Sequence, residues 1–62
     1  MLIGFMFTSE KIDEVNDYND FYNFLHELGA SENKIEFIWN YFRNYGIYAL
    51  VEFRGVKIMR LK

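Results

Sequence analysis

The spacing of apolar side chains predicts two helices in the middle of the chain. Residues 35–45 carry an apolar row at spacings of three and four, the pattern that places side chains on one face of a helix. That row consists of Ile35, Ile38, Trp39 and Phe42, and a second row beside it consists of Phe37, Tyr41 and Tyr45. A helix that is apolar over so much of its circumference needs cover on more than one side. In the second row we expect Tyr41 and Tyr45 to be the exposed pair.

A shorter helix is predicted over about residues 18–28, ahead of the aromatic one. Its apolar row consists of Phe21, Phe24, Leu25 and Leu28. Asp17 is a suitable N-cap, and Gly29 favours the left-handed backbone conformation that ends many helices. Because Ser31 can already cap the second helix, the connection is short and the two helices should form a hairpin. Gly46 is expected to end the second helix as Gly29 ends the first.

The remaining apolar runs predict strands at both ends of the chain. Residues 2–7 are apolar on both alternating faces, as in a strand that is covered on two sides. Residues 47–53 and 56–61 predict a β-hairpin with Arg54-Gly55 as its two-residue turn. The predicted pairs are Phe53 with Val56, Glu52 with Lys57, Val51 with Ile58, Leu50 with Met59 and Ala49 with Arg60. This register sets opposite charges beside the turn and apolar pairs behind them. A type I turn with Gly55 at a bulge is the alternative, and it would shift the pairing.

Residues 8–17 leave two structures open. Thr8 or Ser9 could cap a short helical turn that holds Ile12 and Val15. The stretch could equally be an irregular acidic loop.

Together these elements predict one α+β domain over residues 1–62, with the order β-α-α-β-β. The C-terminal hairpin and the N-terminal strand would form a small antiparallel sheet packed on the two-helix hairpin. Since the hairpin strands pair with each other, the N-terminal strand would join at one side and become an apolar edge, which invites pairing with another chain. The sheet face away from the helices would leave exposed Tyr48, Leu50, Met59 and Leu61. Both features predict a homodimer.

Composition limits how such a small domain can be stabilised. Chains of this size have small cores and are often supplemented by disulfides or metals. This chain has no cysteine and one histidine, which excludes disulfides and a nitrogen/sulfur zinc site. Hydrophobic residues make up 52% of the chain and aromatic residues 21%, so a few large side chains must fill the core. We expect no cofactor.

Targeting and membrane signals are weak. The apolar run at residues 1–7 is far shorter than the roughly 20 residues that a membrane-spanning helix needs. It also lacks the basic start and the cleavage site of a signal peptide, so we expect a cytoplasmic protein and no membrane partner. The low-alanine composition, rich in Asn, Ile, Lys, Phe and Tyr, resembles that of small proteins from AT-rich genomes, including phage accessory proteins.

Charge is divided unevenly along the chain, whose net charge is −2. Nearly all the acidic residues lie in the first half, and they are Glu10, Asp13, Glu14, Asp17, Asp20, Glu27, Glu32 and Glu36. Basic residues dominate the end of the chain, and they are Arg43, Arg54, Lys57, Arg60 and Lys62. A fold that keeps the two sets apart is electrostatically dipolar.

The acidic stretch is the leading candidate for a functional surface. Its carboxylates match no calcium-loop pattern, so we expect no metal site. A face that only keeps the protein soluble is the simpler interpretation. A row of carboxylates can also imitate nucleic-acid phosphates and occupy the basic groove of a partner protein. Our leading hypothesis is a non-enzymatic inhibitor or regulator of a larger protein. Its partner-binding face would consist of Asp13, Glu14, Asp17, Asp20 and two aromatic anchors, Tyr18 and Tyr22.

The basic hairpin supports an alternative hypothesis, a small nucleic-acid-binding protein. The candidate phosphate contacts are Arg54, Lys57, Arg60 and Lys62. Tyr48 or Phe53 could stack on a base beside them. Against this, the chain is acidic overall, whereas nucleic-acid-binding domains are usually strongly basic. Arg60 and Lys62 could instead protect an edge strand or pair with the acidic half of a second subunit.

Candidates for catalysis are few, and we expect no enzyme. The chain has two serines, Ser9 and Ser31, and both are placed as loop or cap residues. His26 could be a general base, but it lies just off the apolar row beside Glu27, and no second histidine joins it. A half-exposed helix histidine is the simpler interpretation.

Overall fold

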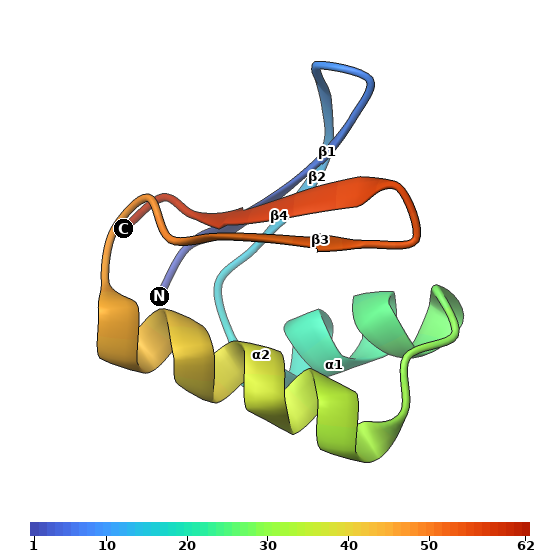
Figure 1. Cartoon of the computed structure of the whole chain (residues 1–62), viewed down its shortest axis with the longest axis vertical. Coiled ribbons are helices and arrows are strands. Elements are labelled where there is room, and N and C mark those ends of the chain that lie inside the picture. Colours follow the sequence, from blue (N-terminus) through green and yellow to red (C-terminus); the bar gives the residue numbers. More distant parts are fainter.

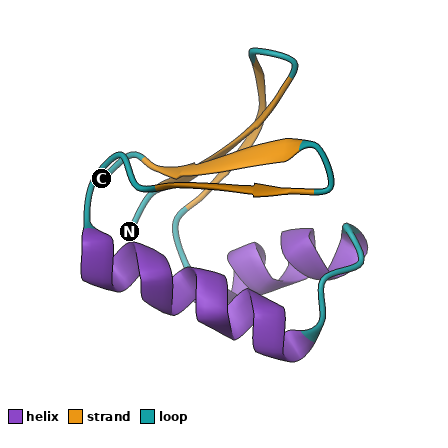
Figure 2. Cartoon of the chain, in the orientation of Figure 1, coloured by secondary structure: helices purple, strands orange, loops and turns teal.

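The computed structural model describes all residues from Met1 to Lys62 and shows an α+β fold with the order β-β-α-α-β-β (Figure 1). The strands are β1 (Ile3–Phe7), β2 (Glu10–Val15), β3 (Leu50–Phe53) and β4 (Val56–Arg60), and the helices are α1 (Tyr18–Glu27) and α2 (Glu32–Tyr45). Figure 2 shows two layers, with the strands in one and both helices on the same side of them. The predicted fold class and the helix hairpin beneath an antiparallel sheet are confirmed.

The sheet has four antiparallel strands in the order β2-β1-β4-β3, so β1 lies inside it. Ile3 pairs with Val15 on one side and with Arg60 on the other, and Phe5 is opposite Ile58. The prediction that the N-terminal strand forms an edge is therefore wrong. Its central position pairs both of its edges, but the two helices cover only one face of the sheet, the face that carries the buried Ile3 and Phe5. The expected cover on both faces is therefore also wrong.

The strand β2 occupies the stretch for which a helical turn or a loop was expected, and both expectations are wrong. Thr8 and Ser9 have positive φ values of 50° and 71° and form the turn that returns the chain along β1. Only Val15 is buried in β2, and a bulge between Phe5 and Met6 of β1 breaks the regular register. Because five of its six residues are exposed, β2 lacks the alternation that marks a half-buried strand.

The predicted C-terminal hairpin register is confirmed. Glu52 is opposite Lys57 and Val51 is opposite Ile58, and the pairs Phe53 with Val56 and Leu50 with Met59 follow in step. The predicted pair of Ala49 with Arg60 lies outside β3, which begins at Leu50, although the Arg60 N–H still donates to the Ala49 carbonyl. Arg54 and Gly55 have φ values of 51° and 84°, the two positive values that a type I′ turn requires. The alternative with a bulge at Gly55 is therefore wrong.

Both helices begin at the predicted caps. The Asp17 side chain accepts a hydrogen bond from the Asp20 N–H at 2.8 Å, and the Ser31 hydroxyl accepts one from the Lys34 N–H at 3.2 Å. Each bond satisfies an N–H group that has no partner within the helix. Gly46 ends α2 at a positive φ of 88°, as predicted.

A single core fills the space between the layers. Its fully buried members are Ile3 and Phe5 from β1, Phe21 and Leu25 from α1, Ile35, Ile38 and Phe42 from α2, and Ile58 from β4. The Phe5 ring stacks on Phe24 at 4.0 Å between ring centroids, and Phe21 meets Trp39 at 5.0 Å. Each such side chain contributes roughly 1.5–3 kcal/mol by leaving water.

The second aromatic row of α2 stays uncovered. Phe37 is 67% exposed and Tyr45 is 72% exposed, while Tyr41 is half-buried against the core. The prediction that Tyr41 and Tyr45 form the exposed pair is therefore wrong for Tyr41. The expectation of cover on more than one side is thus not met within one chain, because the sheet meets only the first row. Neither helix is long and apolar enough to cross a membrane.

Candidate functional site

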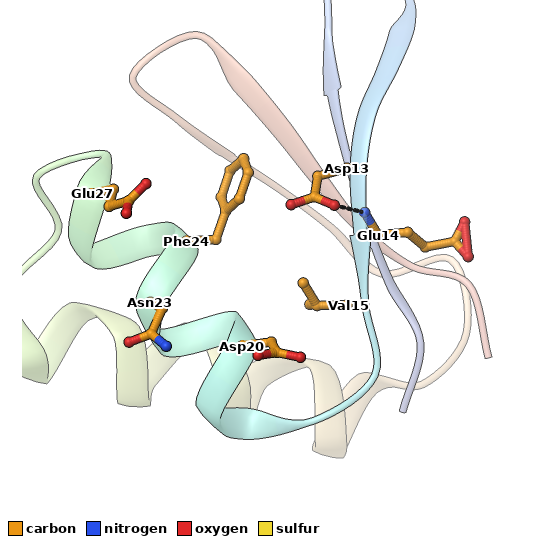
Figure 3. A pocket seen from close by; sticks show the side chains of 7 residues that line it. All are labelled: Asp13, Glu14, Val15, Asp20, Asn23, Phe24 and Glu27. Carbon is orange, nitrogen blue, oxygen red and sulfur yellow. Dashed lines mark hydrogen bonds between the residues drawn. The ribbon is translucent and has the colours of Figure 1, made fainter.

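An acidic groove lies between β2 and α1 (Figure 3). The cavity measures about 300 Å³. It is lined by Asp13, Glu14 and Val15 of β2 and by Asp20, Asn23, Phe24 and Glu27 of α1. We call this surface the acidic groove.

Two backbone periodicities bring these side chains together. In β2, Asp13 and the buried Val15 are two residues apart and therefore point to the helix side of the sheet. In α1, the spacing from Asp20 to Asn23, Phe24 and Glu27 is three, four and seven residues, which aligns them on one flank of the helix. Figure 3 shows the carboxylates of Asp13 and Asp20 pointing into the space between strand and helix.

Most of the negative charge in the groove has no cationic partner. The only ion pair of the chain joins Lys11 to Glu14, which Figure 3 shows pointing away from the helix. Asp13 accepts a hydrogen bond from the Glu14 N–H at 2.8 Å, and this bond leaves most of its acceptor capacity free. The carboxylates of Asp13, Asp20 and Glu27 therefore face water around the half-buried Phe24 ring.

The structure divides the predicted acidic face into separate parts. Asp13 and Asp20 share the groove, whereas the Asp17 carboxylate is used as the N-cap of α1. The two predicted anchors, Tyr18 and Tyr22, lie on the other flank of α1. The sequence analysis did not predict the other α1 residues of the groove, which are Asn23, Phe24 and Glu27. Their spacing from Asp20 is that of one helix flank and could have indicated them.

The flank that carries the tyrosines is turned toward α2. The Tyr18 ring meets Trp39 edge to face at 5.3 Å, and Tyr22 stacks on His26 at 5.7 Å. Desolvation raises the pKa of Tyr18, and the negative charge of Glu36 raises it further. Tyr18 thus takes part in helix packing as much as in any surface.

The basic residues of the hairpin do not share one surface. Arg54 lies at the turn, and its side chain lies close to Gly29 in the connection between α1 and α2. Lys57 alternates with buried neighbours and so faces the outer side of the sheet, opposite Glu52. Arg60 faces the helix layer, where it donates a hydrogen bond to the carbonyl of Phe42 at 2.9 Å. Lys62 is exposed at the end of the chain.

No cluster of catalytic or metal-ligating side chains forms elsewhere. His26 is exposed and has only its aromatic neighbour, and Ser31 is used as a helix cap. No three histidine, aspartate or glutamate side chains gather closely enough to hold a metal ion.

A second surface is aromatic and uncharged. A hollow of about 320 Å³ on the outer side of α2 is lined by Phe37, Asn40, Tyr41, Asn44 and Tyr45. Tyr41 and Tyr45 contact each other at 4.6 Å between ring centroids. The chain that follows exposes Ile47, Tyr48 and Leu50. We call the five lining residues the aromatic surface.

Comparisons with protein-family models, with curated proteins and with solved structures find no match for this chain. Its function is therefore inferred from its own residues.

Proposed function

We propose that this chain is a non-enzymatic protein-binding module, an inhibitor or regulator that captures a basic segment of a larger protein in the acidic groove. The observation that carries the proposal is the convergence of Asp13, Asp20 and Glu27 around Phe24, with no lysine or arginine paired to any of them. Free carboxylates around an apolar floor are complementary to long basic side chains.

An arginine or lysine of a partner could contact both the apolar floor and the carboxylates of the acidic groove. Its methylene stem can cover Phe24 and Val15, while its charged head reaches the carboxylates at the rim. Charge-assisted hydrogen bonds to carboxylates are about twice as strong as neutral ones, and Asn23 adds a side chain that both donates and accepts. A partner surface that normally binds nucleic-acid phosphates would present suitable side chains, which is the basis for proposing mimicry.

The proposal is tested with an arginine-rich peptide carrying a fluorescent label. Neutralising the groove with Asp13→Asn, Asp20→Asn and Glu27→Gln together should weaken the anisotropy-detected affinity by about tenfold, since each exposed ion pair is worth roughly 0.2–1 kcal/mol and three are lost. The matched control, Glu10→Gln with Glu32→Gln and Glu36→Gln, removes the same formal charge outside the groove. It should weaken binding by about twofold at most, through long-range attraction. Equal losses in the two variants would contradict a groove and leave only net charge.

Nucleic-acid binding through the hairpin stays the alternative proposal, with less geometric support. Arg54, Lys57 and Arg60 point to different parts of the surface, so one phosphate backbone could not meet all three without wrapping around the molecule. Charge reversal by Arg54→Glu with Lys57→Glu should abolish salt-sensitive oligonucleotide binding if this alternative holds.

We further propose that a second copy of the chain covers the aromatic surface and β3. Phe37 and Tyr45 are too exposed for large aromatic side chains in a lone chain, and β3 is an unpaired sheet edge. About a twofold axis, an antiparallel strand supplies its own donors and acceptors to its copy. The aromatic surface carries no charge that would repel its equivalent. Sedimentation velocity over a range of concentrations tests this, and a monomer at high micromolar concentration would contradict it.

A further inference from the structure

A shallow hollow of about 480 Å³ lies where the last turn of α2 approaches the end of β4. It is lined by Met1, Trp39, Arg43 and Arg60. None of these residues lines the acidic groove or the aromatic surface. Both of its charged side chains are arginines, in a chain whose net charge is −2.

The guanidinium of Arg60 is held in place by the backbone. Its Nη1 donates to the carbonyl of Phe42 at 2.9 Å, and its Nε donates to the carbonyl of Lys62 at 3.0 Å. The Phe42 carbonyl also accepts the Gly46 N–H at 3.2 Å, so Arg60 is the second donor to this oxygen at the C-terminal end of α2. A guanidinium has more N–H donors than these two bonds use, so Arg60 is a fixed cation with donors to spare.

Arg43 adds a second cation that the fold does not use. It is exposed in the last turn of α2 and makes no hydrogen bond or ion pair within the chain. A positive charge at this end of a helix interacts favourably with the helix dipole. This explains why Arg43 is basic, but the N–H groups of its side chain still have no acceptor. The Arg43 guanidinium therefore has no partner within the chain, while the Arg60 guanidinium is bonded only to main-chain oxygens.

Trp39 contributes an aromatic ring to the lining of the hollow. Its ring is fixed by the edge of Tyr18 at 5.3 Å and by Phe21 at 5.0 Å, and it is only half-buried. Fixed aromatic rings beside arginines are the pattern that binds a base next to its phosphate. A volume of this size lies within the roughly 300–1,000 Å³ that is usual for small-ligand sites.

We propose that this hollow binds a nucleoside monophosphate, with the phosphate between Arg43 and Arg60 and the base against the Trp39 indole. Planar guanidinium groups pair with phosphate oxygens through two parallel hydrogen bonds, which favours phosphate over halide ions. The site is open to water, so millimolar affinity is expected. The proposal is independent of the acidic groove.

The test uses adenosine monophosphate as the probe, at constant ionic strength. Trp39 is the only tryptophan, so its indole N–H signal in a nitrogen–proton NMR spectrum reports on this hollow alone. We expect saturable shifts of that signal and of the Nε–H signals of Arg43 and Arg60. Adenosine and inorganic phosphate should each bind about tenfold more weakly, because each lacks one half of the contact.

Arg43→Gln is the deciding variant, because the side chain is exposed and makes no contact that the fold needs. It should weaken binding of the nucleotide by about tenfold. The matched control, Lys34→Gln, removes an exposed cation of α2 outside the hollow and should leave the affinity unchanged. Absence of saturable shifts, or equal binding by Arg43→Gln and the unchanged protein, would overturn the proposal. Equal binding of inorganic phosphate would overturn the role given to the indole.

Discussion

The two edge strands of the sheet differ in the properties that govern association. The edge strand β2 is mostly charged, is interrupted by a bulge and continues into the acidic flank of α1. The edge strand β3 is apolar apart from Glu52 and follows directly from the aromatic surface of α2. Charge and bulges protect an edge from pairing, whereas an apolar edge permits it. One small sheet thus separates a charged edge, proposed to bind a basic partner, from an apolar edge, proposed to pair with a second copy.

The largest expected effect concerns the core that supports both edges. Phe42→Ala removes a fully buried ring and should cost about 3–5 kcal/mol, which is comparable with the whole stability of a domain this small. Far-ultraviolet circular dichroism and Trp39 fluorescence should then lose their urea transitions together. Tyr45→Ala is the control, since its side chain is 72% exposed. Loss of one signal alone would show that the two sides fold separately.

A second prediction isolates the aromatic side. Phe37→Ser with Tyr45→Ser should weaken self-association by about 2 kcal/mol or more, if these rings are the anchors of the interface. The urea midpoint of the monomer should move little, because exposed substitutions usually change stability by about 0.5 kcal/mol or less. Sedimentation and chemical denaturation measure the two effects separately. An unchanged association constant would remove the aromatic surface from the dimer.

A third prediction distinguishes two kinds of carboxylate on the acidic side. Asp17→Ala should lower the free energy of unfolding by about 1 kcal/mol, because it removes the N-cap of α1. Asp13→Ala should change it by about 0.5 kcal/mol or less, since this exposed carboxylate faces water. Urea denaturation at neutral pH compares them. Similar costs for both would mean that the groove is a structural element.

The smallest expected effect is a pH dependence at the contact between the helices. The raised pKa of Tyr18 means that the folded state favours the protonated phenol. Its contribution to stability is complete below the unfolded pKa of about 10 and is lost as the pH rises through the higher folded value. Tyr18→Phe should therefore reduce the loss of stability above about pH 10. Urea midpoints across that range provide the measurement.

Most of the fold could be predicted because local signals agreed with the tertiary structure. The caps at Asp17 and Ser31 have oxygen side chains in front of periodic apolar rows, and the hairpin register follows from Glu52 opposite Lys57. The strand β2 could not be predicted, because it buries almost nothing and its pairing with β1 is held by backbone bonds. Such a strand leaves no pattern in its own residues.

The candidate site was predicted only in part for a related reason. Asp13 and Asp20 are brought together by the pairing of β2 with β1, a contact that no spacing within the acidic stretch reveals. Tyr18 and Asp20 are close in the sequence, which suggested a shared surface. The helix α1 places their side chains on opposite flanks, with Tyr18 against Trp39 and Asp20 in the acidic groove.

The pairing of β1 with β4 joins segments from the two ends of the chain, with Ile3 opposite Arg60. Closing so long a loop is entropically costly and slows folding compared with local contacts. We therefore expect the β1–β2 hairpin and the two helices to form before β1 pairs with β4, so that this long-range pairing limits the folding rate.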